Sequence, residues 1–502
     1  MPKKRFSIGF DIGSSSVKAS LLNLENSKIE KSDFFPKKEM PITAKQNGWA
    51  EQNPEIWWEN LIKASKSILS NFNNNDEIVS IGISYQMHGL VIIGNDNEIL
   101  HPSIIWCDSR SVEIGERALN DLGKKHCLNN YLNSPGNFTI SKLKWIQENK
   151  PNIYAKIKYV MLPGDYIAYK LTGKINTTIS GLSEGIFWNF KNQSLAKELF
   201  DYFNLSTNLI PEIVNTFEDQ GRLSNKASKE IGIKEGTPIS YRAGDQPNNA
   251  FSLNVLKSGE FAATAGTSGV VYGVFDKPVF DDQMRVNTFS HVNSQISDPK
   301  YGILLCINGC GILNSWLKNQ LLNNQFSYDE MNQNCKNIKI GSDGLVIHPF
   351  GNGAERIFNN KDINANIFGL NFNIHTKNHF IKAVQEGIAC AFKYGLEIME
   401  DINVKPNVIR VSNANLFLSE IFCDTFANIC NTKIEIYNTD GSQGAATGSA
   451  IGIGYFKDFS TSFKNLKIIK TYQPNIKFLN EYNNTYVNWK KYLQIIMLTC
   501  FF

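Results

Sequence analysis

The chain has 502 residues, a length that suits two or three domains, each able to bury its own core. Hydrophobic residues make up 42% and charged residues 20% of the chain, which excludes a disordered or fibrous protein. Lys and Arg total 51 against 47 Asp and Glu, and this near balance, without a long basic run, argues against nucleic acid as a partner.

The two ends of the chain carry short apolar stretches. No stretch reaches the roughly 18 consecutive apolar residues of a membrane-spanning helix, so no membrane contact is expected. The apolar run behind the basic residues 3–5 meets Asp11 after a few residues, too soon for a signal peptide. We therefore expect a cytoplasmic protein whose residues 495–502 end a terminal helix that starts near Tyr486.

Two segments of the chain share one plan. Residues 6–22 form an apolar strand, a Gly/Ser turn and a second alternating strand, and residues 261–274 repeat this plan half a chain later. Two such hairpins indicate a duplicated architecture, with one hairpin opening each domain. We place the boundary within residues 245–254. The predicted division is residues 1–250, residues 251–490 and a tail of residues 491–502.

Strands and helices alternate in the rest of the chain. Short apolar runs indicate strands at residues 78–84, 90–93, 408–411 and 434–437. Helical spacing occurs at residues 55–70 and 141–149, and most clearly at 378–401. This alternation predicts an α/β protein.

The first hairpin turn has the composition of a phosphate site. Asp11 ends the first strand, and Gly13 permits a tight turn whose N–H and hydroxyl groups form a concave donor array. Asp11 is placed to hold Mg²⁺ through its waters. The predicted phosphate contacts are Ser14, Ser15, Ser16 and Lys18. An ordinary Ser-rich hairpin is the alternative, because short Gly/Ser motifs are weak signals.

The second hairpin turn strengthens this interpretation. Gly266 and Thr267 lie in another donor-rich turn, and a nucleoside triphosphate between two domains needs one such turn from each side. The paired turns, with Asp11 and Asp245 before them, resemble the ATPase superfamily of actin, hexokinase and the 70-kDa heat-shock proteins. This resemblance implies two actin/hexokinase-like (ribonuclease H-like) α/β domains with a cleft between them.

A narrower resemblance rests on eight short segments. They occur in the order seen in FGGY carbohydrate kinases, and the similarity runs from about residue 6 to about residue 456. The segment Gln86-Met-His-Gly is most similar to that of the xylulokinases, and the Arg-Glu pair of glycerol kinases is absent there. The segments are residues 86–89, 105–110, 142–145, 162–166, 244–246, 266–269, 368–370 and 383–387.

The resemblance implies ATP-dependent phosphorylation of a ketopentose, D-xylulose at its 5-hydroxyl, with Mg²⁺ as cofactor. It assigns Asp245 as the catalytic base and, with Asp11, as a metal ligand, and it places Met87, His88 and Gln246 against the sugar. A carboxylate near a sugar hydroxyl can take its proton as the oxygen attacks the γ-phosphoryl group. The alternative for Asp245 is a helix N-cap. The alternative for Met87 and His88 is a place in the core, with the hydrogen bonds of the His satisfied there.

Further positions follow from the same resemblance. Trp106, Asp108 and Arg110 are expected to line the sugar mouth, with a structural Asp–Arg pair an equal alternative. Gly311 is expected beside the ribose and phosphates.

The adenosine side departs from the family pattern. Residues 412–416 replace the usual Gly-rich turn, and Asn415 tolerates the left-handed conformation that such a turn needs. Residues 440–446 match the family's small-residue helix start, which we expect to pack tightly against the nucleotide domain.

Competing interpretations remain at the level of sequence. One is a kinase for another sugar of the family (fuculose, ribulose or gluconate), and another is a non-catalytic sensor of sugar and nucleotide.

His375 and His379 lie four residues apart, but no carboxylate in the sequence is placed to complete a zinc site. The expected partners are a sugar and ATP, and a homodimer is compatible with the sequence without being indicated by it.

Overall fold

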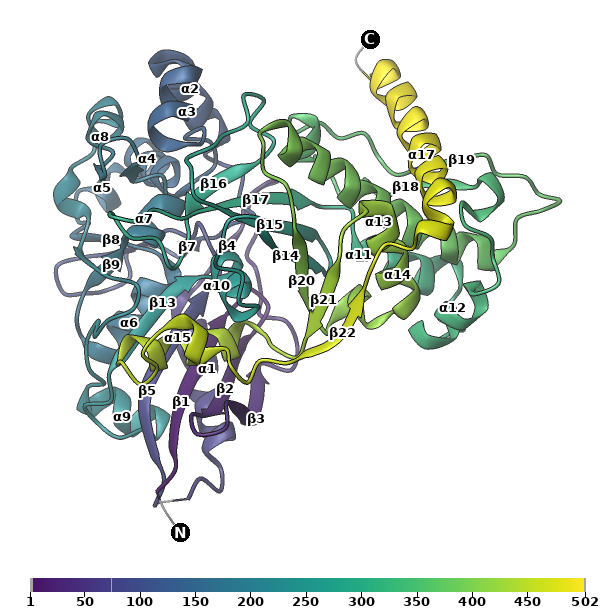
Figure 1. Cartoon of the computed structure of the whole chain (residues 1–502). Helices are drawn as coiled ribbons and strands as arrows, with labels where there is room; N and C mark the ends of the chain where they lie inside the picture. Colours follow the sequence, from purple (N-terminus) through teal and green to yellow (C-terminus); the bar gives the residue numbers. More distant parts are fainter. Residues whose placement is uncertain (1–2, 74, 501–502) are drawn as a thin grey trace.

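The computed structural model describes residues 3–73 and 75–500 (Figure 1). Residues 501 and 502, the end of the predicted tail, lie outside the described residues. The two predicted hairpins open two separate sheets, which occupy the lower left and the centre of Figure 1. The fold is therefore the expected pair of α/β domains.

The first sheet has five strands in the order β3-β2-β1-β5-β13. Strands β1 and β2 form the predicted hairpin, with Asp11 opposite Lys18, and β5 and β13 continue the sheet in parallel. The strands are β1 (Arg5–Ile12), β2 (Val17–Asn23), β3 (Lys28–Phe35), β5 (Glu77–Tyr85) and β13 (Ile239–Gly244).

The second sheet repeats this plan. Its central order β17-β15-β14-β20-β21 matches that of the first sheet, antiparallel on the hairpin side and parallel beyond it, and β16 and β22 extend the two edges. The duplication predicted from the two hairpins is confirmed. The strands are β14 (Glu260–Ala265), β15 (Gly269–Phe275), β16 (Asn287–Ser290), β17 (Tyr301–Ile307), β20 (Val408–Ser412), β21 (Ile434–Tyr437) and β22 (Ile468–Tyr472).

Helices and short strand pairs complete the two halves. Among them, α1, α4 and α13 match the predicted helices within two residues. The helices of the first half are α1 (Pro54–Leu69), α2 (Val112–Leu122), α3 (Lys124–Tyr131), α4 (Thr139–Asn149), α5 (Pro151–Tyr154), α6 (Pro163–Thr172), α7 (Ile179–Glu184), α8 (Lys197–Phe203), α9 (Asn225–Ile231) and α10 (Asp245–Ser252). Those of the second half are α11 (Gly311–Trp316), α12 (Tyr328–Cys335), α13 (Lys377–Asp401), α14 (Glu420–Cys430), α15 (Gly441–Gly452), α16 (Phe459–Ser462) and α17 (Leu479–Cys500). The short strands pair as β4 (Glu51–Gln52) with β7 (Ser103–Ile104), β6 (Val91–Ile93) with β8 (Tyr159–Met161), β9 (Asn176–Thr178) with β12 (Glu212–Val214), β10 (Trp188–Asn189) with β11 (Ser194–Leu195), and β18 (Val346–His348) with β19 (Asn366–Phe368).

Alternation along β1 decides which helix covers which face of the first sheet. Phe6, Ile8, Phe10 and Ile12 are buried in the same core as residues of α1, whereas the opposite face of β1 carries small residues. A methyl group on Gly9 would lie only 1.8 Å from the carbonyl oxygen of Ser442. The backbone of α15 therefore packs directly on this small-residue face.

The prediction that residues 440–446 pack against the nucleotide domain is consequently wrong. Helix α15 lies against β1, β5 and β13 of the first sheet, although it comes from the last quarter of the chain (Figure 1). The physical reason is the groove left by glycines on two neighbouring strands, because a methyl group on Gly82 would lie 1.9 Å from the carbonyl oxygen of Ala445. The chain thus crosses back to the first domain after building the second.

The terminal helix is longer than predicted. α17 starts at Leu479, before the expected Tyr486, and it runs through the predicted 490/491 boundary, so the tail is not a separate unit. Its apolar side is buried through Tyr482, Trp489 and Leu493. No helix in the described part of the chain is both long and apolar enough to cross a membrane.

Candidate functional site

The first hairpin turn lies beside a cluster of charged groups from distant parts of the chain. Lys18 Nζ is 2.7 Å from Asp440 Oδ2, and Asp440 also caps the N-terminus of α15. Burial raises the pKa of Asp11, and the nearby Asp440 carboxylate raises it further. The charges predicted for this turn are therefore present, but Lys18 is paired with an acidic residue that sequence reasoning did not assign.

The Ser-rich turn itself is held in place by its backbone. The Gly13 N–H donates to the carbonyl oxygen of Ser16 at 3.0 Å, which closes the turn. Gln52 donates to the carbonyl of Ser14 and the N–H of Met40 donates to that of Ser15. Ser15 is exposed at the turn, whereas Ser14 and Ser16 are half-buried.

Asp245 begins α10 at the end of strand β13. Gly244 is the N-cap residue, so the N-cap alternative for Asp245 is wrong and its carboxyl group is available for other work. Burial raises the pKa of Asp245 to about 7, and the carboxylate of Asp11 adds to this shift. The backbone N–H and side chain of Gln246 oppose the shift by hydrogen bonding to the carboxylate. A carboxyl group that titrates near neutral pH is suited to general-base chemistry.

Met87 lies beside the start of α10, and His88 follows it in the chain. A methyl group on Gly244 would lie 2.6 Å from Met87 Cγ, so the side chain of Met87 packs against the residue that precedes Asp245. His88 adopts a left-handed backbone conformation with φ of 61°, which a non-glycine residue rarely does.

The chemical state of His88 follows from its contacts. Burial lowers the pKa of His88 to about 3, so its ring is neutral at physiological pH. Its Nδ1 lies 2.9 Å from the carbonyl oxygen of Glu184, and a carbonyl only accepts, so Nδ1 carries the proton. Nε2 is therefore a hydrogen-bond acceptor, which suits a sugar hydroxyl.

Asp108 and Arg110 form the ion pair that the sequence left as an alternative. Arg110 donates to both oxygens of Asp108 and to Glu51, and its guanidinium stacks on Trp49 at 3.8 Å from the ring centroid. Both side chains are buried, and their hydrogen-bonding groups are used within this network. Trp106 differs, because its side chain is 50% exposed and its Nε1 donates to Ser14 Oγ at 3.4 Å.

A cavity of about 440 Å³ opens beside the second hairpin turn. The turn of Gly266 and Thr267 lies against the start of α11, where the N–H groups of Gly311 and Ile312 donate to its carbonyl oxygens at 2.9 and 3.1 Å. A methyl group on Gly311 would lie 2.2 Å from the Gly266 carbonyl oxygen, so this approach requires glycine. Thr267 is exposed at the tip of the turn.

Asn415 also lines this cavity. It has a φ of 55°, the left-handed conformation that was expected to replace a glycine, whereas Asn413 has no positive φ. Its side-chain amide would lie 3.5 Å from a methyl group on Gly266. The altered turn therefore still brings residues of 412–416 to the second hairpin.

Three buried ionisable residues near these turns were not assigned from the sequence. Glu355 accepts hydrogen bonds from the N–H groups of Asn308 and Gly309, both at 2.9 Å, and so fixes the segment that leads into α11. Lys142 donates to the carbonyl oxygens of His88 and Ile105, and burial lowers its pKa to about 7. Glu184 is the third. Only Lys142 had a sequence signal, its place in the segment 142–145.

The acidic groups suit a divalent cation that is held partly by water. Asp11 and Asp245 are close enough that the first raises the pKa of the second, and a cation would relieve this repulsion. The described residues contain no cluster of three or more His, Cys, Asp or Glu side chains able to hold a metal. Mg²⁺ commonly binds through one or two carboxylates, waters and substrate phosphates, so the donor set fits it.

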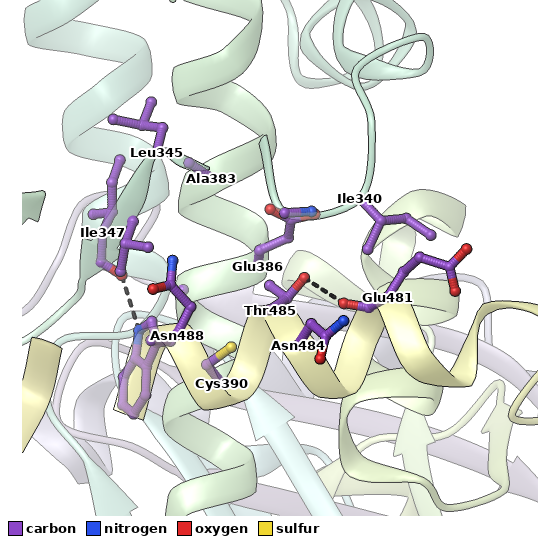
Figure 2. A pocket seen from close by; sticks show the side chains of 14 residues that line it. Ile340, Leu345, Ile347, Ala383, Glu386, Cys390, Glu481, Asn484, Thr485 and Asn488 are labelled. Carbon is purple, nitrogen blue, oxygen red and sulfur yellow. Dashed lines mark hydrogen bonds between the residues drawn. The ribbon is translucent and has the colours of Figure 1, made fainter. Parts of the chain in front are cut away.

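A second cavity, of about 370 Å³, lies between α13 and α17, away from the hairpin turns (Figure 2). Glu386 on α13 is buried at its edge, where it accepts from the N–H of Gly341 at 2.9 Å and from Ser342 Oγ at 2.7 Å. Trp489 of α17 donates to the carbonyl oxygen of Ile347 at 3.1 Å. These contacts hold α13 and α17 against the segment of residues 341–347.

The duplicated fold, the paired turns and the acidic residues beside them define a two-domain phosphotransferase. Residues 6–252 match the N-terminal domain, and residues 261–455 the C-terminal domain, of the FGGY family of carbohydrate kinases. The chain therefore belongs to this family, and the resemblance stated from its motifs is confirmed.

Individual relatives place the chain among sugar kinases. It is 27% identical over 465 residues to a xylulose kinase of Bacillus subtilis (strain 168), covering 90% of this chain and 89% of that protein. It is 26% identical over 394 residues to a gluconokinase of the same organism, covering 76% and 74%. Its fold matches the ligand-bound xylulose kinase from Lactobacillus acidophilus with a TM-score of 0.88 at 23% identity, over 98% of both chains.

Proposed function

We propose that the protein transfers the γ-phosphoryl group of ATP to the 5-hydroxyl of D-xylulose. The observation that carries this proposal is the position of Asp245 at the end of β13. Its neighbours are the Asp11 carboxylate, on the side of the first hairpin turn, and Met87, which packs on Gly244. A base at this point stands between a phosphate turn and a sugar-binding side chain.

The positions of the two turns indicate where each substrate would bind. ATP would lie with its phosphates between the first turn and the turn of Gly266 and Thr267, and with its adenosine in the cavity bounded by Gly311 and Asn415. The sugar would lie against Met87 and His88, with Nε2 of His88 accepting a hydrogen bond from a hydroxyl. Closure around both substrates would keep water from the γ-phosphate.

Asp245 would accept the proton of the attacking hydroxyl as its oxygen bonds to phosphorus. Gln246 hydrogen bonds to the Asp245 carboxylate and so orients it for this task. Asp11 and Asp245 would hold Mg²⁺, which supplies charge neutralisation on the β- and γ-phosphates when it is bound. Trp106 would flank the mouth of the site beside Ser14, held there by the loop that Asp108 and Arg110 brace.

Support for the sugar comes from the relatives named xylulose kinase, at 27% and 28% identity over 90% of the chain. The gluconokinase relative keeps a sugar acid as the second candidate. The sensor alternative loses support, because the altered turn at 412–416 still brings Asn415 to the nucleotide cavity.

The test is an ADP-release assay with D-xylulose, D-ribulose, L-fuculose, D-gluconate and glycerol, run with and without Mg²⁺. We expect D-xylulose to give the highest kcat/KM, glycerol to be poor and EDTA to abolish turnover. A higher kcat/KM for any other acceptor would overturn the sugar assignment. Turnover with none of them would favour the sensor.

A further inference from the structure

Arg356 lies close to a residue assigned to the sugar, although it belongs to the second half of the chain. It begins the 3₁₀ turn Arg356–Phe358, and its Nη1 donates to Asn287 Oδ1 on β16. Asn287 and Phe289 are two residues apart on this strand, so their side chains point to the same face. The ring of Phe289 packs against that of His88, with centroids 5.3 Å apart. The guanidinium of Arg356 is therefore carried on the face of β16 that meets His88, and its charge adds to the burial that lowers the pKa of that ring.

Strand β16 is hydrogen-bonded to the first half of the chain, where the two halves meet (Figure 1). The N–H of Thr288 donates to Asn133 Oδ1 at 3.0 Å, and Asn133 Nδ2 donates to the carbonyl oxygen of Thr288 at 2.7 Å. The N–H of Ser290 donates to Ser183 Oγ on α7 at 3.0 Å. These bonds fix the strand, and with it the guanidinium of Arg356, relative to the first domain.

Arg356 differs from the other arginines that are withdrawn from water, because it has no acidic partner. Five arginines are buried or half-buried in the described part of the chain, and four of them contact a carboxylate within 3.0 Å. These four are Arg110, Arg242, Arg285 and Arg410. No carboxylate of the described residues lies within ion-pair distance of Arg356, and burial lowers its pKa without removing its charge. A charge taken out of water without a partner costs free energy, so Arg356 points to a ligand that supplies the partner.

The free donors of Arg356 define the chemistry of that ligand. A guanidinium has five N–H donors and no acceptor, and among the described residues only Asn287 accepts from this one. An oxygen that accepts hydrogen bonds and has no proton of its own to place suits these donors, which describes a carbonyl or a carboxylate. D-Xylulose with a free 5-hydroxyl is in its open-chain form and presents a carbonyl, and a sugar acid presents a carboxylate. A polyol has neither group.

We propose that Arg356 is a specificity-determining residue that binds a carbonyl or carboxylate oxygen of the acceptor, so that the enzyme favours a ketose or a sugar acid over the corresponding polyol. The second domain would thus read the acceptor, in addition to binding the nucleotide. This inference rests on the proposed function, because it takes His88 as a sugar contact, and it deepens that function by naming the group of the acceptor that is recognised.

The test compares kcat/KM for D-xylulose with that for xylitol and D-arabinitol, the two products of reducing its carbonyl. A hydrogen bond to a charged group supports a preference of about 10–100-fold for D-xylulose in the wild type. Arg356→Met should abolish most of this preference by lowering the kcat/KM of D-xylulose, with little change for the polyols. Arg356→Lys keeps the charge but loses the planar fork of donors, so its preference should lie between the two.

D-Gluconate and D-glucitol extend the test to a carboxylate. A preference for D-gluconate over D-glucitol that Arg356→Met removes would show that Arg356 binds a carboxylate. The same loss confined to D-xylulose and its polyols would show that it binds a carbonyl. Either result supports the proposal, and preferences that Arg356→Met leaves unchanged in both sets would overturn it.

Arg285→Met is the matched control, because it makes the same change at a half-buried arginine that is paired with Asp281 at 2.8 Å. It leaves Asp281 without its partner, so its melting temperature should fall while its acceptor preferences equal those of the wild type. Arg356→Met removes an unpaired charge, so without substrate it should melt at or above the wild-type temperature. A fall as large as that of Arg285→Met, with wild-type preferences, would make Arg356 a structural residue and overturn the proposal.

Two further outcomes separate this proposal from its neighbours. If Arg356→Met raises the KM for ATP and lowers kcat/KM for every acceptor by one factor, Arg356 binds the phosphoryl group and the proposal is wrong. Failure of the wild type to phosphorylate D-xylulose would contradict the proposed function, whereas D-gluconate and D-glucitol would still test Arg356. If the variants misfold, equal use by the wild type of D-xylulose and xylitol, and of D-gluconate and D-glucitol, would overturn the proposal.

Discussion

The two hairpins have the same fold but different chemistry. The first turn is surrounded by ionisable side chains, with Asp11 and Lys18 on its strands and Asp440 opposite. The second turn, at Gly266 and Thr267, is bound by backbone N–H groups of α11 and has no charged residue of its own. In the proposed function the duplicated architecture would separate two tasks, with proton transfer and metal binding beside the first turn and nucleotide binding beside the second.

The largest effect is expected at Asp245, near the ionisable residues of the first turn. Asp245→Asn keeps the shape of the side chain but cannot accept a proton, so kcat should fall by about 10²–10⁴-fold, the usual contribution of a general base. Binding of the sugar, measured by calorimetry, should change much less. Turnover near the wild-type level would contradict the assignment of Asp245.

The pH dependence of stability provides the control for this variant. The pKa of Asp245 is about 7 in the folded protein against an ordinary 3.8, so the folded state binds the extra proton. The wild type should therefore lose stability as pH rises from about 4 to 7, and Asp245→Asn should lack this component. Melting temperatures at pH 5 and pH 8 should show the variant gaining relative to the wild type at pH 8.

A smaller effect is expected at His88. Removing the acceptor Nε2 in His88→Ala leaves a sugar hydroxyl unpaired, a cost of about 1–3 kcal/mol in sugar recognition. His88→Asn is the matched control for the backbone, because Asn tolerates the φ of 61° better than Ala does. Both variants should bind ATP as the wild type does. A loss of ATP binding, with sugar binding retained, would contradict the assignment of His88 to the sugar.

The nucleotide side is tested at Thr267, which is exposed at the tip of the second turn. Thr267→Phe should crowd the phosphates and raise the KM for ATP by about tenfold, equivalent to about 1.4 kcal/mol. Thr267→Val keeps the shape without the hydroxyl and should show a much smaller change. The sugar affinity of both variants should match the wild type, and unchanged kinetics in Thr267→Phe would remove the phosphate assignment.

The smallest effect is expected at the pair of Lys18 and Asp440. Their side chains are 36% and 38% exposed, and an ion pair at this exposure contributes about 0–1 kcal/mol. Lys18→Met should therefore lower the free energy of unfolding by less than about 1 kcal/mol, measured by urea denaturation. If Lys18 also contacts phosphates, the KM for ATP will rise by more than this stability loss explains. An unchanged KM would restrict Lys18 to pairing with Asp440.

Several features of the candidate site could be predicted because each depends on residues that are close together in the chain. The hairpins, the left-handed Asn415 and the position of Asp245 after an apolar strand follow from short patterns, and the fold repeats them as expected. For Asp108 and Arg110 the sequence left two alternatives open, a place at the sugar mouth and a structural ion pair. Its outcome depends on Glu51 and Trp49, which approach from an earlier segment of the chain.

What the sequence determined by itself is therefore the class of fold and the two hairpin turns, because hydrogen bonding in a turn and alternation in a strand involve near neighbours in the chain. Only the tertiary structure decided that α15 returns to the first sheet, that Asp440 meets Lys18, and that the buried Glu184 lies near Asp245. These contacts join residues that are far apart along the chain, and they depend on which surfaces leave room for one another. Gly9 and Gly82 show the reason, since the absence of two side chains admits the backbone of a helix more than 350 residues away.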